Sequence, residues 1–416
     1  MLSKLREDLS IIRGNLLVLI ISWVILHFAF SMIFPYESPY IEALGASPFI
    51  IGALGSLGNI ILTIVRIPGS YIADHYGRRQ IIVTMTFGIA IAQLIYALAP
   101  DWTFIILAVL LSNLCLIYQP ALEAITADSI PLEKRGLGFA MVRTIPDILT
   151  IFSPLIAGYI VENMGLVPGM RIIYTLTFIF ALMAAIIRLF FLKETLDKSR
   201  RIKFSEIKRI YRESIPSIVS IWREIPSTLK ILTLISIISA FEDPIYMRFS
   251  SLYALHVVRI SKFEWGLVGT ILTALSFILG IPLGKVVDII GRKKALAVAY
   301  ITFIVGGLIF IFSKNVYHVI LSFSLFAVGG SLFMPSYDAM VTDLTEKEKR
   351  GRVMGVMGTL NILAAAPASI IGGALYQLEP QLPFILTIIT GLFSLTIILV
   401  MVKETKPKNN LRISMG

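Results

Sequence analysis

Three ionisable residues, Glu242, Asp243 and Arg248, lie close together in a stretch of the chain that is otherwise largely apolar. Charged groups are costly to bury away from water, so such residues are candidates for binding protons, ions or substrates. Because Glu242 and Asp243 are adjacent, they cannot share one face of a helix, and we expect only one of them to line a cavity. The alternative is an internal salt bridge from these acids to Arg248 that only stabilises the helix.

A second group of ionisable residues occurs in apolar stretches of the first half of the chain. Glu123 and Arg143 could pair across neighbouring helices as a gating or structural contact, and Asp338 repeats the acid in the second half. Asp147 follows Arg143 by about one helical turn and is a candidate proton site. All four residues are therefore treated as candidates for proton or substrate binding.

Of four isolated ionisable residues, two allow more than one interpretation. His27 either titrates, since histidine changes charge near neutral pH, or is a hydrogen-bonded packing residue. Arg66 either lines a cavity or pairs with an acid. Arg188 is near enough to a helix end to extend its charge into water, and Glu42 is expected to be solvated.

The elements that position these residues are long apolar segments. The chain has 416 residues, is 56% hydrophobic and only 15% charged, and has a mean hydropathy of +0.84. A bilayer can accommodate such a chain, with about 20 apolar residues for each spanning helix, and helices satisfy their own backbone hydrogen bonds there. We predict an all-α integral membrane protein with twelve spans: 14–35, 48–73, 80–99, 102–128, 137–161, 170–192, 227–256, 263–287, 293–312, 316–343, 352–377 and 382–402.

The distribution of basic residues predicts how the chain is oriented in the membrane. The formal net charge is +11, and most lysines and arginines fall in connections on one side of the predicted spans. By the positive-inside rule, both termini are expected in the cytoplasm of a multi-pass protein of the cell membrane. This topology explains the basic charge without nucleic acid as a partner. No cleavable signal peptide is expected, and the single cysteine, Cys115, makes a thiolate metal site implausible.

Two halves of the sequence repeat each other. A motif of acid, glycine and two basic residues recurs 214 residues later, and a second set that includes Asp128 and Asp343 recurs at 215. Each half ends in Lys-Glu-Thr, at 193–195 and 403–405. Repetition at nearly one offset indicates duplication. We predict six-helix bundles over residues 1–194 and 227–416, joined by a basic amphipathic cytoplasmic linker at 195–226. The first motif comprises Asp74, Gly77, Arg78 and Arg79, and the second comprises Asp288, Gly291, Arg292 and Lys293.

Twelve spans in two parallel halves, with Gly284–Lys293 reading G-x-x-x-D-x-x-G-R-K, resemble the major facilitator superfamily over essentially the whole chain. The first copy departs from the family pattern at Ser70 and His75. The resemblance implies alternating access. It also implies that Asp74 faces the start of helix 11, the eleventh predicted span (352–377), and that Asp288 faces the start of helix 5, the fifth span (137–161). In addition, a basic residue of the first loop is expected to bind Asp128 at the end of helix 4, and one of the second loop to bind Asp343 at the end of helix 10. These contacts would latch the halves together on the cytoplasmic side. The implied gating residues are Asp74, Gly77, Arg78, Arg79, Asp128, Gly284, Asp288, Gly291, Arg292, Lys293 and Asp343.

The resemblance and the buried charges favour a secondary transporter. The leading hypothesis is proton-coupled efflux of amphipathic or drug-like compounds, and the alternative is a proton symporter for sugars or organic anions. An anionic substrate would favour Arg66, Arg143 or Arg248 in the cavity. A membrane receptor or enzyme in a transporter-like fold is a third class. The sequence contains no catalytic triad spacing, HExxH helix or P-loop, so we expect no enzyme activity, cofactor or metal, and a unit that works as a monomer.

Overall fold

The computed structural model describes residues 11–75, 77–196, 222, 225–346 and 350–404. The described part of the first half consists of helices that begin where the sequence leaves its polar connections. The predicted linker lies almost entirely outside the described residues. The elements of the first half are α2 (Asn15–Ile33), α3 (Glu37–Ala43), α4 (Pro48–His75), α5 (Arg78–Leu98), α6 (Trp102–Cys115), η1 (Leu116–Tyr118), α7 (Gln119–Asp128), η2 (Leu132–Lys134), α8 (Arg135–Thr150), α9 (Ser153–Met164) and α10 (Leu166–Phe191).

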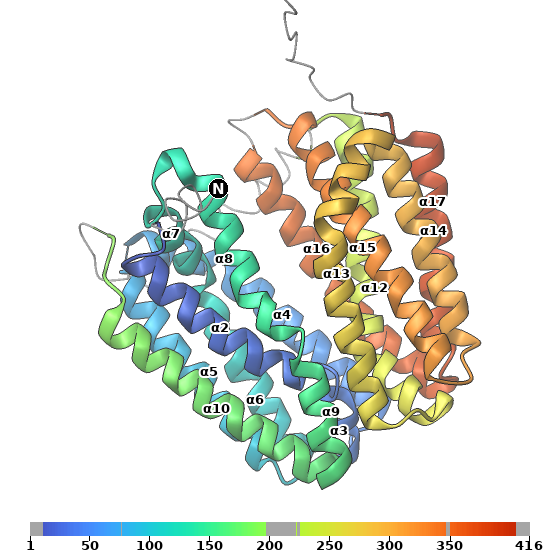
Figure 1. The fold of residues 1–416 in the computed structure, drawn as a ribbon, viewed down its shortest axis with the longest axis horizontal. Coiled ribbons are helices and arrows are strands. Elements are labelled where there is room, and N and C mark those ends of the chain that lie inside the picture. The colour runs from blue at the N-terminus through green and yellow to red at the C-terminus, as the bar shows by residue number, and fades with distance from the viewer. Residues whose placement is uncertain (1–10, 76, 197–221, 223–224, 347–349, 405–416) are drawn as a thin grey trace, which may run out of the picture.

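The second half repeats this order with fewer interruptions. Its elements are α12 (Ser227–Tyr253), the π-helical turn η3 (Ala254–Val258), α13 (Lys262–Ile290), α14 (Arg292–Ile311), α15 (Val316–Leu344), α16 (Arg350–Leu378) and α17 (Leu382–Met401). Figure 1 shows the two halves side by side, with the first half in blue to green and the second in yellow to red.

Two of the predicted spans are broken helices. The span predicted over 102–128 changes to a 3-10 turn at η1 before α7, and Pro120 stands in the first turn of α7. The span predicted over 137–161 breaks after Thr150, and Pro154 stands in the first turn of α9. Proline lacks a backbone N–H and is well suited to the first turn of a helix. Helix 4 is therefore α6 plus α7, and helix 5 is α8 plus α9.

Eleven helical segments of the described chain are long and apolar enough to cross a membrane. The remaining predicted span, α12, is 27 residues long, but it carries Lys230, Glu242, Asp243 and Arg248. These charges, and not its length, distinguish it from the other predicted spans. The acids singled out from the sequence thus lie on a helix that is costly to insert into a membrane.

The halves meet chiefly along two helix pairs. Helices α4 and α16 pack along much of their length, and α9 packs against α13. At the α9–α13 crossing, a methyl group added to Gly158 would lie 3.3 Å from the Cα of Gly266, which is closer than side chains ordinarily pack, so the two glycines allow a close approach of the helices. We call the end of the molecule that carries Gly77 and Gly291 the basic face, and the end that carries the α9–α13 crossing the distal face. The halves converge at the distal face and diverge toward the basic face (Figure 1).

Candidate functional site

A cavity of about 370 Å³ lies within the second half. Its walls come from α12, α13, α14, α15 and α17, and the described part of the first half contributes Phe34 and Pro35. The lining is dominated by aromatic and aliphatic side chains, with a few polar groups. This volume and composition are typical of a site for a small organic molecule.

Both adjacent acids of α12 line the cavity. The prediction that only one of them would do so is wrong. Successive residues of a helix diverge by about 100°, but the cavity extends from α13 on one side of α12 to α17 on the other. The Thr390 hydroxyl of α17 donates to Glu242 Oε1 at 2.6 Å, whereas Asp243 is exposed to the open space. Glu242 is thus fixed in the wall, and Asp243 is available to a ligand.

Arg248 does not form the internal salt bridge considered as an alternative. It crosses from α12 to the first half, where a methyl group added to Gly55 of α4 would lie 2.6 Å from its guanidinium carbon. Arg66 crosses in the opposite direction, and a methyl group on Gly358 of α16 would lie 3.6 Å from its Nη2. Neither arginine lines the cavity. Both contribute to the seam between the halves.

His27 and Asp147 form a pair in the first half. The distance from His27 Nδ1 on α2 to Asp147 Oδ1 on α8 is 2.9 Å, so that the ring N–H donates to the carboxylate. The two side chains are 45% and 55% exposed, which argues against the packing role considered for His27. The structure therefore joins two candidates that are 120 residues apart in the sequence.

The remaining intramembrane candidates lie outside the cavity. Glu123 on α7 and Asp338 on α15 are both exposed. Arg143 lies on α8, but its side chain is outside the described residues, so its predicted pairing with Glu123 stays a prediction. Arg188 differs from expectation because it is fully buried on α10 and does not extend into water. It donates to Ser22 Oγ at 3.0 Å and to Thr86 Oγ1 at 2.9 Å, which joins α10 to α2 and α5.

The repeated loops at the basic face contain the ion pairs implied by the resemblance. Arg78 pairs with Asp128, and Arg292 pairs with Asp343. Gly77 and Gly291 have φ angles of 112° and 92°, in the region that favours glycine, and each immediately precedes a helix. The glycines thus permit the turn that brings each arginine to its acid.

Two acids that were not assigned to the site complete these loops. Glu194 accepts hydrogen bonds from the backbone N–H groups of Arg78 and Arg79 at 3.2 and 3.0 Å. Glu404 does the same for Arg292 and Lys293 at 2.9 and 3.2 Å. Each carboxylate therefore satisfies unpaired N–H groups at a helix start and favours the positive end of the helix dipole. The repeated Lys-Glu-Thr tripeptide was the sequence signal for them.

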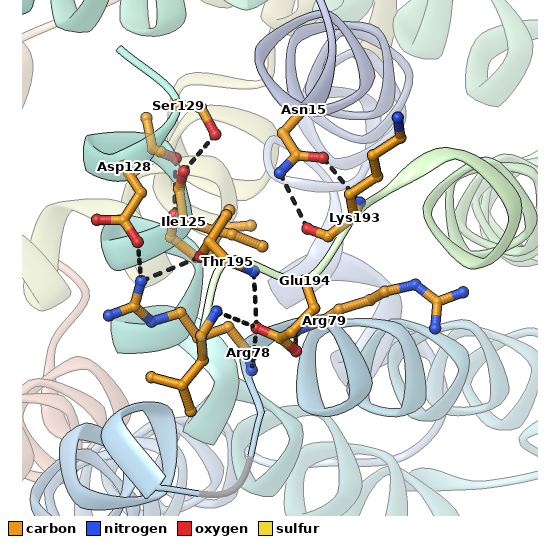
Figure 2. Close-up of polar contacts among 12 residues, drawn as sticks. Asn15, Arg78, Arg79, Ile125, Asp128, Ser129, Lys193, Glu194 and Thr195 are labelled. Atoms are coloured by element: carbon orange, nitrogen blue, oxygen red, sulfur yellow. Dashed lines mark hydrogen bonds and ion pairs between the residues drawn. The ribbon is translucent and has the colours of Figure 1, made fainter. Parts of the chain in front are cut away.

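Asn15 helps to position Glu194 in the first half. Its side-chain amide donates to the carbonyl of Lys193 at 2.9 Å, and its side-chain carbonyl accepts from the Lys193 N–H at 2.7 Å. Figure 2 shows these two hydrogen bonds beside Glu194, with Arg78 pointing toward Asp128. The start of α2 and the end of α10 thereby hold the acid against the start of α5.

These contacts join helices within one half. The basic residues were expected to latch the halves together, but their described partners Asp128, Glu194, Asp343 and Glu404 each belong to the same half as the basic residue. The physical reason is that the halves diverge at this face. Asp288 is exposed near the end of α13, one turn after Gly284 in the same helix, and the Asp74 side chain is outside the described residues. A latch through these two aspartates stays a prediction.

The distal face carries contacts between the halves that gave no signal in the sequence. Tyr36 Oη donates to the carbonyl of Lys262 at 2.6 Å, and Trp265 Nε1 donates to that of Pro35 at 2.9 Å. In addition, Glu162 of α9 accepts from the N–H of Phe263 at 3.2 Å. We call these contacts, with the Gly158–Gly266 crossing, the distal junction.

A contact between two ionisable side chains adds to the distal junction. His256 Nε2 lies 3.4 Å from Glu42 Oε2, and the side chain of Glu42 is 29% exposed. Burial raises the pKa of Glu42, and nearby His256 opposes this rise. Glu42 is therefore an interface residue, and the expectation that it is simply solvated is wrong.

Comparisons with known proteins agree with this architecture. The family model described as Major Facilitator Superfamily matches residues 19–252 and 232–414. An uncharacterised MFS-type transporter of Methanocaldococcus jannaschii is 26% identical over 88% of this chain and 90% of its own length. The multi-drug resistance efflux pump PmrA of Streptococcus pneumoniae is 23% identical over 78% of this chain and 79% of its own.

Solved structures share the fold at low sequence identity. A bacterial homologue of the human lysosomal transporter Spinster, inward-facing and occupied, superposes with a TM-score of 0.74 at 13% identity, over 92% of this chain and 95% of that one. A point mutant of the nucleoside transporter NupG also gives 0.74 at 13% identity, over 94% of this chain and all of that one. The family match over almost the whole described chain, the duplicated six-helix halves and their paired basic loops establish that this chain is a membrane transporter of the major facilitator superfamily.

Proposed function

We propose that this chain is a proton-coupled exporter of amphipathic organic cations, and that it works by alternating access. The observation that carries the proposal is the cavity in the second half, whose aromatic walls hold both Glu242 and Asp243. Aromatic faces attract cations, and a desolvated carboxylate does so more strongly. The same carboxylates can exchange a proton for the substrate, because a ligand cation and a proton compete for one negative charge.

The composition of the cavity argues against the alternative substrates. Among the described residues that line it, none is basic, although an organic anion would call for a positive partner. Sugars would call for more hydrogen-bonding groups than these mainly apolar walls offer. The similarity to the multi-drug pump of Streptococcus pneumoniae supports export of drug-like compounds, at 23% identity.

The arrangement of the halves fits one state of the transport cycle. On the topology proposed from the basic loops, the basic face is cytoplasmic and the distal face is external. The distal junction is closed, and the halves diverge at the basic face. We therefore assign the structure to the state open toward the cytoplasm, in which an exporter takes up its substrate.

A liposome assay tests the proposal. The purified chain is reconstituted with a pH-sensitive dye inside, a pH gradient is imposed, and the aromatic cation ethidium is compared with an anionic dye of similar size. We expect proton movement driven by ethidium and not by the anionic dye. Glu242→Gln and Asp243→Asn, made separately, should each weaken ethidium binding at least about tenfold, or about 1.4 kcal/mol, since each removes a negative charge from the wall that faces the bound cation.

Glu379→Gln is the matched control, because Glu379 is exposed at the end of α16 and lies outside the cavity. It should leave ethidium transport unchanged. If both cavity variants retain substrate-driven proton movement, these carboxylates do not couple transport to protons. Movement driven by the anionic dye alone would contradict the proposed substrate class.

A further inference from the structure

We propose that His27 and Asp147 form a proton-binding site of the first half, separate from the carboxylates of the cavity, and that its protonation holds α8 in place at the basic face. The proposal rests on the alternating access described above but not on the identity of the substrate. The ligand is a proton taken up from water on the imidazole ring, which turns a hydrogen bond to Asp147 into an ion pair.

The position of the pair indicates access to water within the membrane. His27 follows Asn15, the first residue of α2, by twelve residues, which places it about 18 Å along the helix, within a hydrocarbon layer about 30 Å thick. Both side chains are about half exposed. A half-exposed charged pair facing lipid at this depth would be costly, so the pair is expected to face the aqueous passage.

The helix face of His27 supports this orientation. Phe34 follows His27 by two helical turns, and residues at this spacing share one face. Phe34 continues the helical backbone past the end of α2 and lines the cavity in the other half. The face of α2 that carries His27 is therefore the face turned toward the second half.

Asp147 lies beside the break in helix 5. It precedes the end of α8 at Thr150 by one turn, and the Thr150 hydroxyl donates to the Asp147 carbonyl at 2.6 Å. Beyond the break, α9 belongs to the distal junction, whereas α8 packs chiefly against α2. The contact with His27 thus ties the segment on the basic side of the break to α2, so that α8 can respond to it separately from α9.

Several charged groups on the surrounding helices have partners away from this pair. Arg188 of α10 bonds Ser22 and Thr86, and Arg171 of α10 donates to the carbonyl of Ala99. Glu162 of α9 caps α13 at the distal face, and Asp128 of α7 pairs with Arg78. The remaining charged residues on helices that pack against α2 or α8 are Arg135 and Arg143 of α8, Glu123 of α7, and Glu133 and Lys134 of η2.

The second half has a contact between the corresponding helices that does not titrate. Ser236 Oγ of α12 donates to Asn361 Oδ1 of α16 at 3.0 Å. Helix α16 is also continuous through this region, whereas helix 5 is divided. In the first half, therefore, a contact whose charge can change lies next to a break in the helix. Ser236→Ala removes the matching contact without removing a titratable group.

The test measures conformation and needs neither a substrate nor a gradient. Spin labels are attached to cysteines at Gly136 on α8, where added atoms meet open space, and at Ile289 on α13, which is 82% exposed. The background is Cys115→Ala, and distance distributions are recorded in lipid nanodiscs from pH 5.5 to 8.5. Protonation strengthens the pair, so the diverged population should dominate at low pH. We expect its ratio to the closed population to fall by up to about fivefold as the pH rises, the range for partly exposed ion pairs.

Asp147→Asn and His27→Gln should each reduce this pH dependence to the part that Glu42 contributes at the distal junction, and Ser236→Ala should retain all of it. His27→Lys, which keeps a positive charge throughout, should hold the diverged population at both ends of the range. The proposal is overturned if Asp147→Asn keeps the pH dependence of the parent, or if Ser236→Ala loses it to the same extent. Failure of ethidium export would leave these distances unaffected, so the two proposals fail separately.

Discussion

Glu194 and Glu404 occupy equivalent positions in the two halves, so each half serves as the control for a quantitative prediction about the other. Replacing Glu194 by alanine removes the acceptor for the N–H groups of Arg78 and Arg79. Loss of an acceptor at a helix start costs about 0.5 to 2 kcal/mol, and the charge adds about 0.3 to 1 kcal/mol through the helix dipole. Because Glu194 is exposed, we expect about 1 kcal/mol, equivalent to about a fivefold change in local opening.

Hydrogen–deuterium exchange in nanodiscs measures this opening directly. In Glu194→Ala, the peptide that contains the start of α5 should exchange about fivefold faster, and the peptide that contains the start of α14 should exchange as before. Glu404→Ala should give the reverse pattern. Glu194→Gln keeps an acceptor and should have a smaller effect. Unchanged exchange at the start of α5 in a folded Glu194→Ala protein would refute the capping role.

Two further predictions concern the distal junction. Gly266→Ala places a methyl group 2.8 Å from Tyr36 Oη, so we expect a loss of about 1 to 3 kcal/mol of closure and faster labelling of a cysteine at Phe34 from the outer side. Gly280→Ala on the same helix meets open space and should label at the parent rate. Because burial raises the pKa of Glu42, protonation favours the closed junction, and this contribution is lost as the pH rises through that raised pKa. Glu42→Gln, which cannot ionise, should therefore keep labelling slow at high pH, and labelling that accelerates as in the parent would contradict this role.

The recurrence of one motif in both halves of the sequence allowed most of the correct predictions about the basic face. Gly77 and Gly291 indicated turns, and Asp128 and Asp343 recurred at nearly the same offset, so each copy supported the interpretation of the other. The family resemblance implied an ion pair in each loop without choosing between its two basic residues, and the pairs Arg78–Asp128 and Arg292–Asp343 are present. Glu194 and Glu404 carried the same signal, but capping requires knowing that the end of each half returns to the start of its third helix.

Other features depend on packing that no local pattern encodes. The breaks before α7 and α9 accompany prolines, but prolines are tolerated in membrane helices, so residue type alone does not predict a break. His27 and Asp147 each looked like a single candidate, because their contact depends on how α2 packs against α8. The two acids of α12 both line the cavity because of its breadth, which depends on the positions of α13 and α17.

The placement of the cavity within one half has a mechanical consequence. Five helices of the second half surround the compartment, and Phe34 and Pro35 are the only lining residues from the described part of the first. When the two halves move relative to each other, a bound molecule would keep nearly all its contacts and move together with the second half. The first half would then open and close access to the cavity as the end of α2 moves across its entrance. The two duplicated halves would thus have different roles, because one binds the substrate and the other controls access to it.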